Sequence, residues 1–259
     1  MKSLPLSQLQ THHSLQRVAV VATDLDGTLT HQGKFTPGLL QALEALAAAS
    51  VAVVIVTGRS AGWVSGLVSY LPVVGAIAEN GGIFYPSNGT PVLLTPIADL
   101  NHHRQQLAAG FAHLLAEFPQ LQETSDNPFR LTDWTFEVAG LTSDHLQRLR
   151  FLCAEMGWGF TFSTVHCHIK PRNQDKAVAL MEVLRDRFPD YTSDRVVTVG
   201  DSPNDESLFD RTLFPLSVGV ANLAEYFDIL THHPAYLTDL PESEGFCELV
   251  RAILAAQFP

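Results

Sequence analysis

The stretch VAVVATDLDGT, residues 18–28, decides the fold that we predict for this chain. Its first six residues are apolar or β-branched without interruption, which is typical of a strand buried on both faces of a parallel sheet. The run ends at Asp24, and Asp26 follows two positions later. The stretch therefore predicts a buried strand that presents two carboxylates at its carboxyl end.

Strands and helices alternate on both sides of this stretch. Thr36 and Pro37 predict a helix start, because threonine caps a helix and proline fits its first turn. A second apolar run lies at 51–56, a helix is expected from about 61 to 70, and a third run lies near 73–78. This order predicts a parallel sheet with right-handed crossovers. The rhythm resumes later in the chain, with helices at 176–188, after Asp205 and at 244–257, and strands at 196–199 and 215–220.

Residues 85–170 have a different pattern of apolar and polar residues. Apolar and polar residues alternate at 133–138 and again at 159–169, and amphipathic helices are expected before each segment. Alternation indicates an antiparallel sheet that is covered on one face only. The predicted organisation is thus a polar N-terminal leader at 1–16, an α/β core of 17–84 and 171–259, and an inserted α+β unit of 85–170.

The composition is that of a globular protein, because 46% of the 259 residues are hydrophobic and 17% are charged. The formal net charge of −11, without a dense basic cluster, argues against a nucleic-acid partner. No apolar run reaches the length of a membrane span, so no membrane association is predicted. The three cysteines have neither a zinc-site nor a disulfide-framework spacing, which favours a reducing cytoplasm.

Two acidic segments indicate a metal site. Asp24 and Asp26 crowd like charge just past a strand, and a cation between them would relieve the repulsion. The alternative is that one aspartate caps a helix and the other forms a turn. Gly200 to Asp205, GDSPND, follows another buried strand, and the oxygens of Asp201, Asn204 and Asp205 suit Mg²⁺. A Ser-Pro turn feeding a capped helix would explain the turn but not the acid cluster.

Two further segments indicate a site for an anion. The hydroxyl and backbone N–H groups of Thr57-Gly58-Arg59-Ser60 can hold a phosphoryl oxygen at a helix N-terminus. The simpler alternative is that Thr57 or Ser60 only caps the helix. Lys176, in the first turn of its predicted helix, opposes the helix dipole and so indicates an anion nearby, unless it is a solvated side chain.

Taken together, these segments resemble the haloacid dehalogenase-like hydrolases, with DxDGT at Asp24 to Thr28, Thr57 at a strand end, Lys176, and GDSxND at Gly200 to Asp205. The resemblance implies a Rossmann-like parallel-sheet core, and the insertion resembles the C2-type cap of that superfamily. Glu79-Asn80-Gly81-Gly82 and the approach to Lys176 resemble the Cof-like branch. That branch includes sugar-phosphate, sucrose-phosphate, mannosyl-phosphoglycerate and archaeal-type phosphoglycolate phosphatases.

The resemblance also implies a role for each residue. Asp24 would attack phosphorus to form an aspartyl-phosphate, and Asp26 would protonate the leaving alcohol and then deprotonate water. Thr57 would bind the transferred group, and Lys176 and Mg²⁺ would neutralise its charge. The implied metal ligands are Asp24, the Asp26 carbonyl and Asp201. Asn204 and Asp205 would either bind the metal directly or support these ligands. The expected phosphate-side binding residues are Thr57, Gly58, Arg59 and Asn80.

Three residues of the insertion are expected to contact the part of the substrate that is not transferred. On a predicted strand from Phe160 to Lys170, His166, His168 and Lys170 share one face by period two, and of these His168 and Lys170 are the candidates. Arg130 is the third, since a guanidinium binds a carboxylate or phosphate with two bonds. The alternatives are a solvated cap surface and a surface arginine.

The predicted function is an Mg²⁺-dependent phosphomonoesterase acting on a small phosphorylated metabolite, such as a sugar phosphate, phosphoglycolate or phosphoglycerate. A serine esterase of the GDS type, with Ser202 as nucleophile, is one alternative, but no DxxH follows in the sequence. A non-catalytic protein that binds phosphorylated metabolites would normally lose Asp24 or Asp26. A mutase shares the aspartyl-phosphate, but its cap usually interrupts the chain soon after the first motif.

Overall fold

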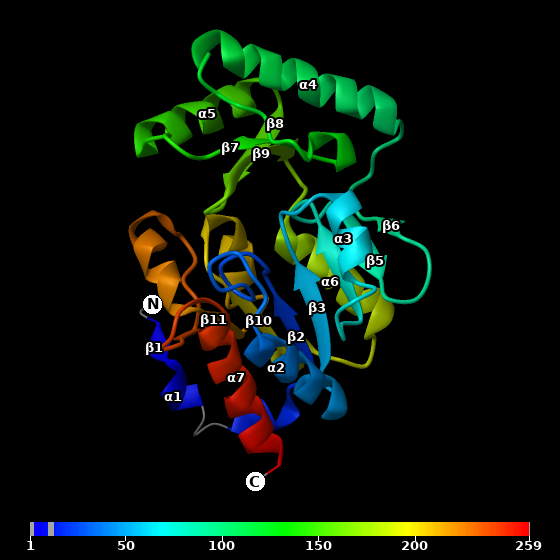
Figure 1. Ribbon diagram of the computed structural model, residues 1–259, viewed down its shortest axis with the longest axis vertical. Helices are drawn as coiled ribbons and strands as arrows, with labels where there is room; N and C mark the ends of the chain where they lie inside the picture. The colour runs from blue at the N-terminus through cyan, green and yellow to red at the C-terminus, as the bar shows by residue number, and fades with distance from the viewer. Residues whose placement is uncertain (1–2, 10–12, 259) are drawn as a thin grey trace.

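The computed structural model describes residues 3–9 and 13–258, and it has a large α/β body with a smaller unit above it (Figure 1). The body contains a nine-stranded sheet in the order β1-β12-β11-β10-β2-β3-β4-β5-β6. Neighbouring strands are parallel except at β4–β5 and β5–β6, which are antiparallel. The predicted parallel sheet is therefore confirmed. The strands are β1 (Leu4–Pro5), β2 (Val20–Thr23), β3 (Ala52–Val56), β4 (Gly75–Ala78), β5 (Ile83–Pro86), β6 (Val92–Leu93), β10 (Val196–Gly200), β11 (Leu216–Gly219) and β12 (Tyr236–Leu237).

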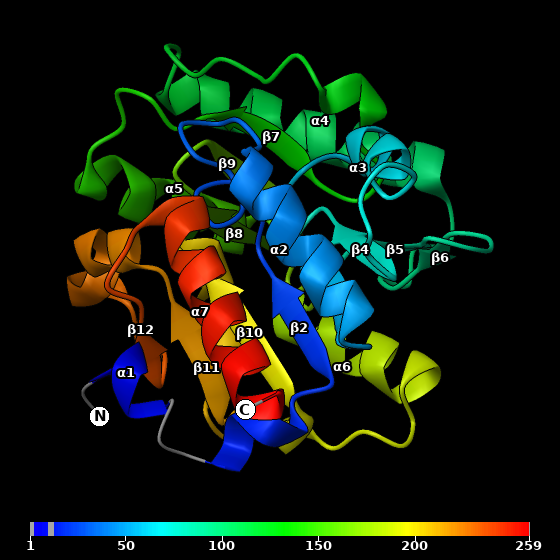
Figure 2. The ribbon, with the colours of Figure 1, turned by 60° about the horizontal axis from the view of Figure 1, so that its bottom comes forward.

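Helices cover both faces of this sheet. On one face α2 (Pro37–Ala48) and α7 (Glu242–Gln257) lie side by side (Figure 2) and pack on Val21 and Val53. On the other face α6 (Lys176–Arg187) packs on Val20 and Val54. Adjacent strand residues thus point to opposite faces, and both faces are buried, which explains why the core strands have uninterrupted apolar sequences. The remaining helices of the body are α1 (Leu6–Leu9), η1 (His13–Arg17), α3 (Ala61–Leu67), η3 (Ser193–Arg195), η4 (Pro203–Phe209) and η5 (Ala221–Ile229).

The N-terminal segment is part of the core. The side chains of Leu6, Leu9 and Leu15 are fully buried in the cluster beneath α7, and β1 pairs with β12. The prediction of a polar leader at 1–16 is therefore wrong for the described residues of that segment. The sequence is polar on average, but its few leucines are the residues that the fold buries.

The inserted unit, which we call the cap, is a three-stranded antiparallel sheet in the order β7-β9-β8, covered on one side by two helices. Phe111 of one helix and Leu149 of the other pack on Phe136 and Ile169 of the sheet. The opposite face of the sheet looks toward the body (Figure 1). The elements of the cap are α4 (Leu100–Glu117), η2 (Asn127–Phe129), β7 (Trp134–Glu137), α5 (Ser143–Glu155), β8 (Trp158–Phe162) and β9 (His166–Pro171).

Two predicted boundaries need correction. Residues 85–94 contain the end of β5 and all of β6, which belong to the sheet of the body, so the cap begins after β6 and not at 85. The single strand predicted from Phe160 to Lys170 is two antiparallel strands, because the chain reverses between Phe162 and His166. No helix within the described residues is long and apolar enough to cross a bilayer.

Candidate active site

The predicted functional residues meet at one edge of the large sheet, beneath the cap. Asp24 directly follows β2, Thr57 follows β3, Asn80 comes shortly after β4, and Asp201 follows β10. Because β10, β2, β3 and β4 are adjacent and parallel, their carboxyl ends lie next to one another. Open α/β sheets bind their ligands at this edge.

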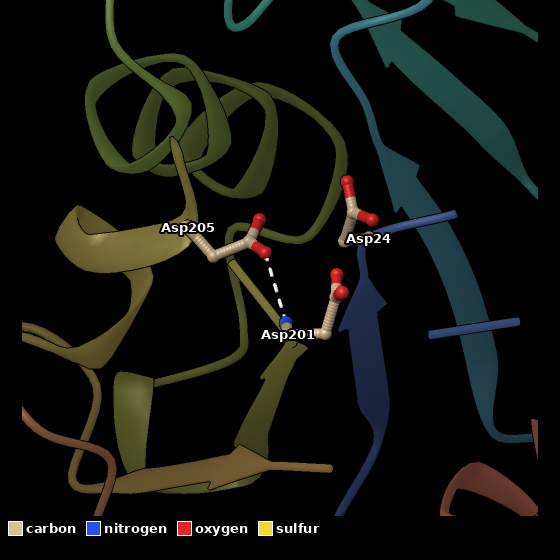
Figure 3. Close-up of side chains that lie close together, drawn as sticks. All are labelled: Asp24, Asp201 and Asp205. Carbon is tan, nitrogen blue, oxygen red and sulfur yellow. Dashed lines mark hydrogen bonds between the residues drawn. The ribbon is translucent and has the colours of Figure 1, made fainter. Parts of the chain in front are cut away.

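Three carboxylates and one ammonium form the floor of the site. Oxygens of Asp24, Asp201 and Asp205 all lie within 4.8 Å of one another (Figure 3). The Nζ of Lys176 lies 2.6 Å from Oδ1 of Asp24 and 2.7 Å from Oδ1 of Asp205. All four side chains are buried. The lysine neutralises only part of the negative charge, so the buried cluster has more acidic than basic groups.

This excess charge shifts the pKa values of the cluster. Burial, together with Asp205, raises the pKa of Asp24 to about 8 although Lys176 opposes the shift. Burial and the charge of Asp24 raise the pKa of Asp201 well above its ordinary value. Burial disfavours the charge of Lys176, but Asp205 and Asp24 outweigh that effect and raise its pKa. A further cation at this place would therefore be stabilised.

The donor set fits Mg²⁺, which prefers carboxylate and carbonyl oxygens. Asp201 is fixed on both sides, since Thr28 Oγ1 donates to its Oδ1 at 3.3 Å and Asn222 Nδ2 donates to its Oδ2 at 3.0 Å. Gly27 has a φ of +82°, and a Cβ there would lie 2.3 Å from Asp201 Oδ2. Gly27 of the DxDGT motif thus allows the carboxylate of Asp201, in the GDSxND motif, to approach closely.

Asp205 and Asn204 already have protein partners. Oδ2 of Asp205 accepts from the backbone N–H groups of Asp201 and Ser202, at 3.0 and 3.2 Å, while its Oδ1 accepts from Lys176. Oδ1 of Asn204 accepts from Ser202 Oγ at 2.7 Å. Asp205 therefore orients the loop after β10 and the lysine, and direct ligation of a metal by Asn204 or Asp205 stays a prediction.

These pKa shifts predict how Mg²⁺ should stabilise the protein at different pH. The folded-state pKa of Asp24, about 8, lies above its unfolded value, so the metal-free protein loses stability as the pH rises from about 4 to about 8. Bound Mg²⁺ favours the ionised carboxylate and should offset this loss. We expect the increase in melting temperature on adding Mg²⁺ to be larger at about pH 8 than at about pH 5. Thermal unfolding with and without the metal measures it, and an equal increase at both pH values would contradict it.

The loop after β3 holds Thr57 beside Asp24 and Asp26 in one cavity wall. Thr57 Oγ1 accepts from the backbone N–H of Arg59 at 3.1 Å, so the hydroxyl proton remains to donate elsewhere. Ser60 precedes α3, but its side chain makes no capping hydrogen bond. The alternative in which Ser60 serves as a side-chain cap is therefore wrong.

Asp26 stands beside Asp24 and pairs with Arg59. The Nε and Nη2 of Arg59 donate to the two carboxylate oxygens of Asp26, at 2.7 and 2.6 Å. Both side chains are partly exposed. The guanidinium thus fixes the orientation of the carboxyl group that is expected to act as acid and base.

One small cavity joins these groups to the cap. Its walls from the body include Asp24, Asp26 and the loop after β3, and the reversal between β8 and β9 closes it from above. Its volume is about 10 Å³, which is room for about one water molecule. The cap therefore lies closed on the body. The lining residues are Asp24, Asp26, Thr57, Gly58, Arg59, Ser163, Val165, His166, His168 and Asn204.

His166 and Asn80 also border the site. His166 lines the cavity although it was not among the predicted site residues, and its place on the same face of the strand as His168 was the available signal. Burial and the nearby His168 lower the pKa of His166 to about 4. Asn80 Oδ1 accepts from Asn204 at 3.0 Å, and Asn80 Nδ2 has no hydrogen-bond partner within the described residues. A role of Asn80 in binding the substrate stays a prediction.

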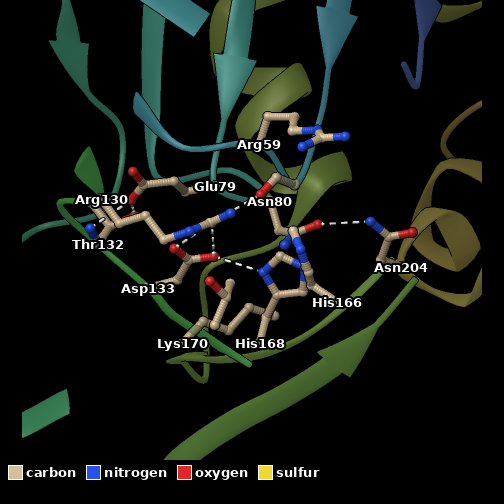
Figure 4. A network of polar contacts seen from close by, with 12 residues as sticks. Arg59, Glu79, Asn80, Arg130, Thr132, Asp133, His166, His168, Lys170 and Asn204 are labelled. Atoms are coloured by element: carbon tan, nitrogen blue, oxygen red, sulfur yellow. Dashed lines mark hydrogen bonds and ion pairs between the residues drawn. The ribbon is translucent and has the colours of Figure 1, made fainter. Parts of the chain in front are cut away.

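Arg130 does not reach the cavity, contrary to the expectation that it contacts substrate. Its side chain is fully buried. Its Nη1 donates to both oxygens of Asp133, at 2.9 and 3.1 Å, and to the Gly58 carbonyl at 2.9 Å, and its Nε and Nη2 donate to Asp126 (Figure 4). Asp133 also holds Nδ1 of His168 at 2.8 Å. The guanidinium is thus committed to protein partners.

Lys170 is buried and lines a second, larger cavity of about 420 Å³ instead of the one over Asp24. Its Nζ donates to the Gln174 carbonyl. Asn80, Lys176 and Asn204 border this second cavity as well. Of the three cap residues that were predicted to bind substrate, only His168 lines the cavity beside Asp24 and Asp26.

The serine-esterase alternative finds no support in the geometry. Ser202 is buried and its Oγ donates to Asn204. Within the part of the chain that the structure describes, no histidine is hydrogen-bonded to it. A serine nucleophile needs such a base.

Comparisons with known proteins agree with this site. The family model of haloacid dehalogenase-like hydrolases matches residues 21–107. A phosphoglycolate phosphatase of Methanothrix thermoacetophila is 27% identical over 244 residues, which cover 92% of this chain and 98% of the relative. Phosphoglycolate phosphatase 1 of Saccharolobus solfataricus is 26% identical over 245 residues, which cover 93% and 98%.

Solved structures share the fold over nearly the whole chain. A Thermoplasma acidophilum protein has a TM-score of 0.73 at 18% identity and covers 91% of this chain and 98% of its own. The sucrose-phosphatase of Synechocystis, solved with sucrose and phosphate, has a TM-score of 0.67 at 16% identity and covers 92% and 98%. The family model, the relatives and the four motifs gathered at one sheet edge together support a phosphatase that is similar to the haloacid dehalogenase-like hydrolases.

Proposed function

We propose that this phosphatase hydrolyses a small phosphorylated metabolite with the help of Mg²⁺, through an aspartyl-phosphate on Asp24. The observation that carries the proposal is the placement of Asp24. Its carboxylate lies between Lys176 and Asp201 on the floor of the cavity, with Asp26 in the wall beside it. A nucleophile, a proton donor and charge-stabilising groups thus meet in one place, which phosphoryl transfer requires.

The carboxylates of Asp24 and Asp201, with the Asp26 carbonyl, would hold Mg²⁺, and the bound ion would neutralise negative charge on the phosphoryl group. Lys176 adds a second positive charge at the nucleophile. The Thr57 hydroxyl, with its oxygen already accepting from Arg59, would donate to a phosphoryl oxygen. These contacts are common to all phosphomonoesters.

The reaction takes place in two steps. An Asp24 oxygen attacks phosphorus, the bond from phosphorus to the leaving oxygen breaks, and Asp26 gives that oxygen its proton. Asp26 then removes a proton from a water molecule that attacks phosphorus, and the bond from phosphorus to the Asp24 oxygen breaks. Inorganic phosphate leaves, and both carboxyl groups return to their initial state.

The cavity above Asp24 holds about one water molecule, so the cap must shift to admit a phosphoryl group. The relatives are named for phosphoglycolate, and we propose phosphoglycolate as the first compound to test, followed by sugar phosphates. A cytoplasmic location and the absence of nucleic-acid and membrane partners stay predictions.

Removing divalent metal should abolish activity. The wild-type protein, treated with EDTA, is expected to release no phosphate from p-nitrophenyl phosphate or phosphoglycolate, because the buried carboxylates then repel the incoming phosphoryl group. Adding Mg²⁺ in excess should restore the rate. Colorimetric phosphate release measures both, and a carboxyl ester such as p-nitrophenyl acetate serves as the control substrate. Full activity in EDTA, or hydrolysis of the carboxyl ester alone, would overturn the proposal.

A further inference from the structure

A segment of the cap runs alongside the phosphate-binding loop of the body. Arg130 donates to the carbonyl of Gly58, at 2.9 Å. One residue before it, Phe129 packs so closely on Gly62 that a Cβ on the glycine would lie 2.8 Å from the Cβ of Phe129. The loop therefore has a neighbour from the cap near each of its ends.

Glu79 ties the same two segments together. This fully buried carboxylate accepts from the backbone N–H of Ala61 at 2.8 Å, at the start of α3. It also accepts from the backbone N–H groups of Leu131 and Thr132, at 3.0 and 2.6 Å. Residues 129–132 of the cap and residues 58–62 of the body thus form one hydrogen-bonded and packed unit.

The peptide group between Gly58 and Arg59 is held at both ends. Its carbonyl oxygen accepts from Arg130, and its N–H donates to Thr57 Oγ1 at 3.1 Å. The orientation of this peptide determines whether its N–H can donate to the Thr57 hydroxyl. It also determines the direction in which the Arg59 side chain extends toward Asp26. The contact from Arg130 therefore bears on both sides of the phosphoryl site.

Arg130 is rigid enough to fix this peptide. Its guanidinium is fully buried between Asp126 and Asp133, and hydrogen bonds to both carboxylates leave it one orientation. Burial opposes the charge of Asp133, but Arg130 and His168 hold its pKa below the ordinary value. The planar fork of an arginine can serve three such acceptors at once, whereas a lysine ammonium at this place cannot.

We propose that Arg130 is a positioning residue of the phosphatase reaction, which holds the Gly58–Arg59 peptide so that Thr57 and Arg59 face the phosphoryl group and Asp26. The inference rests on the proposed function. It assigns a cap residue to the chemistry that all phosphomonoesters share, and not to recognition of the leaving group. A displacement of about 1 Å in such a group can reduce a rate by about 100-fold.

Arg130→Met tests the proposal with two substrates, p-nitrophenyl phosphate and phosphoglycolate. We expect kcat to fall by about 100-fold on both, with the ratio of the two kcat/KM values unchanged. The inhibition constant of orthovanadate, which occupies the phosphoryl site alone, should rise in parallel. Arg104→Met is the matched control, because it removes another partly buried arginine of the cap, whose Nη1 and Nη2 donate to the carbonyls of Asp133 and Asn127 and not to Gly58. Its kcat should stay within about threefold of wild type.

Arg130→Lys keeps the buried positive charge and addresses the case in which the methionine variant does not fold. We expect the lysine variant to fold, as judged by circular dichroism, and to remain slow on both substrates. Wild-type kcat in either variant would overturn the proposal. So would a rise in KM for phosphoglycolate alone, which indicates substrate contact, or an equal loss in Arg104→Met, which indicates a general effect of disturbing the cap. A wild-type protein that hydrolyses no phosphomonoester would overturn the proposed function itself, and this inference with it.

Discussion

Asp24→Asn is expected to stop turnover, with kcat falling by roughly 10⁴-fold or more, as is usual when a nucleophile is removed. The amide is the same size as the carboxyl group but cannot form an acyl phosphate. The protein should remain folded, because Asp24 is buried among like charges and its pKa is raised to about 8. At neutral pH the unfolded chain ionises this carboxyl group while the metal-free fold keeps it largely protonated. This difference destabilises the fold, so the variant should be at least as stable as wild type without Mg²⁺.

Asp26→Asn separates the nucleophile from the acid. This variant keeps Asp24, so it should lose only about 10²- to 10⁴-fold in kcat and still form the aspartyl-phosphate from p-nitrophenyl phosphate, whose leaving group needs little protonation. Acid quenching and mass spectrometry of the intact protein would detect the phosphorylated species in Asp26→Asn and not in Asp24→Asn. Wild-type rates in Asp24→Asn, or phosphate found on Ser202, would show that the assigned nucleophile is wrong.

The sequence predicted the floor of the site because the relevant signals are local. Buried parallel strands have continuous apolar runs, and the residues that follow them are brought to one edge by the sheet itself. Asp24, Thr57 and Asp201 could therefore be placed together before any contact was known. Helix α6 begins at Lys176, as expected, and the anions that its position required are Asp24 and Asp205.

The cap was harder to predict because its residues depend on contacts between distant segments. Glu79 accepts from Leu131 and Thr132, 52 and 53 positions away, and no local pattern indicates that pairing. Arg130 did carry a local signal, since its partners Asp126 and Asp133 lie four residues before and three residues after it. Acidic residues at those spacings indicate that the charge of Arg130 is already neutralised within the cap. An arginine with such partners is not available to bind a substrate.

The prediction of a polar leader at the N-terminus was wrong for a different reason. Leu6, Leu9 and Leu15 are separated by polar residues, and the helices that carry them are only four and five residues long. Periodicity needs a longer window than this to distinguish a buried segment from a polar tail. Burial at this end of the chain is decided by β12 and α7, which lie more than 200 residues away in the sequence.

Lys176→Met is expected to damage both stability and activity. The change leaves Asp24 and Asp205 buried without the ammonium that contacts them at 2.6 and 2.7 Å. Breaking a buried ion pair by removing one partner typically costs about 3–5 kcal/mol. Activity should fall by about 100-fold or more, because the charge next to the nucleophile is lost. Urea unfolding and phosphate release measure the two effects.

The loss of stability should depend on pH in a direction that follows from the carboxylates. Asp24 already has a folded-state pKa of about 8 with the lysine present, and without it that pKa should rise further. Protonated aspartates tolerate burial, so the variant should lose least at about pH 5 and progressively more toward about pH 8. Mg²⁺ should restore part of the lost stability at the higher pH, since it replaces the missing positive charge.

Lys34→Met, at an exposed lysine, provides the control and should change stability by less than about 0.5 kcal/mol. A Lys176→Met protein that unfolds at the same urea concentration as wild type throughout this pH range would mean that the lysine does not hold the two carboxylates together.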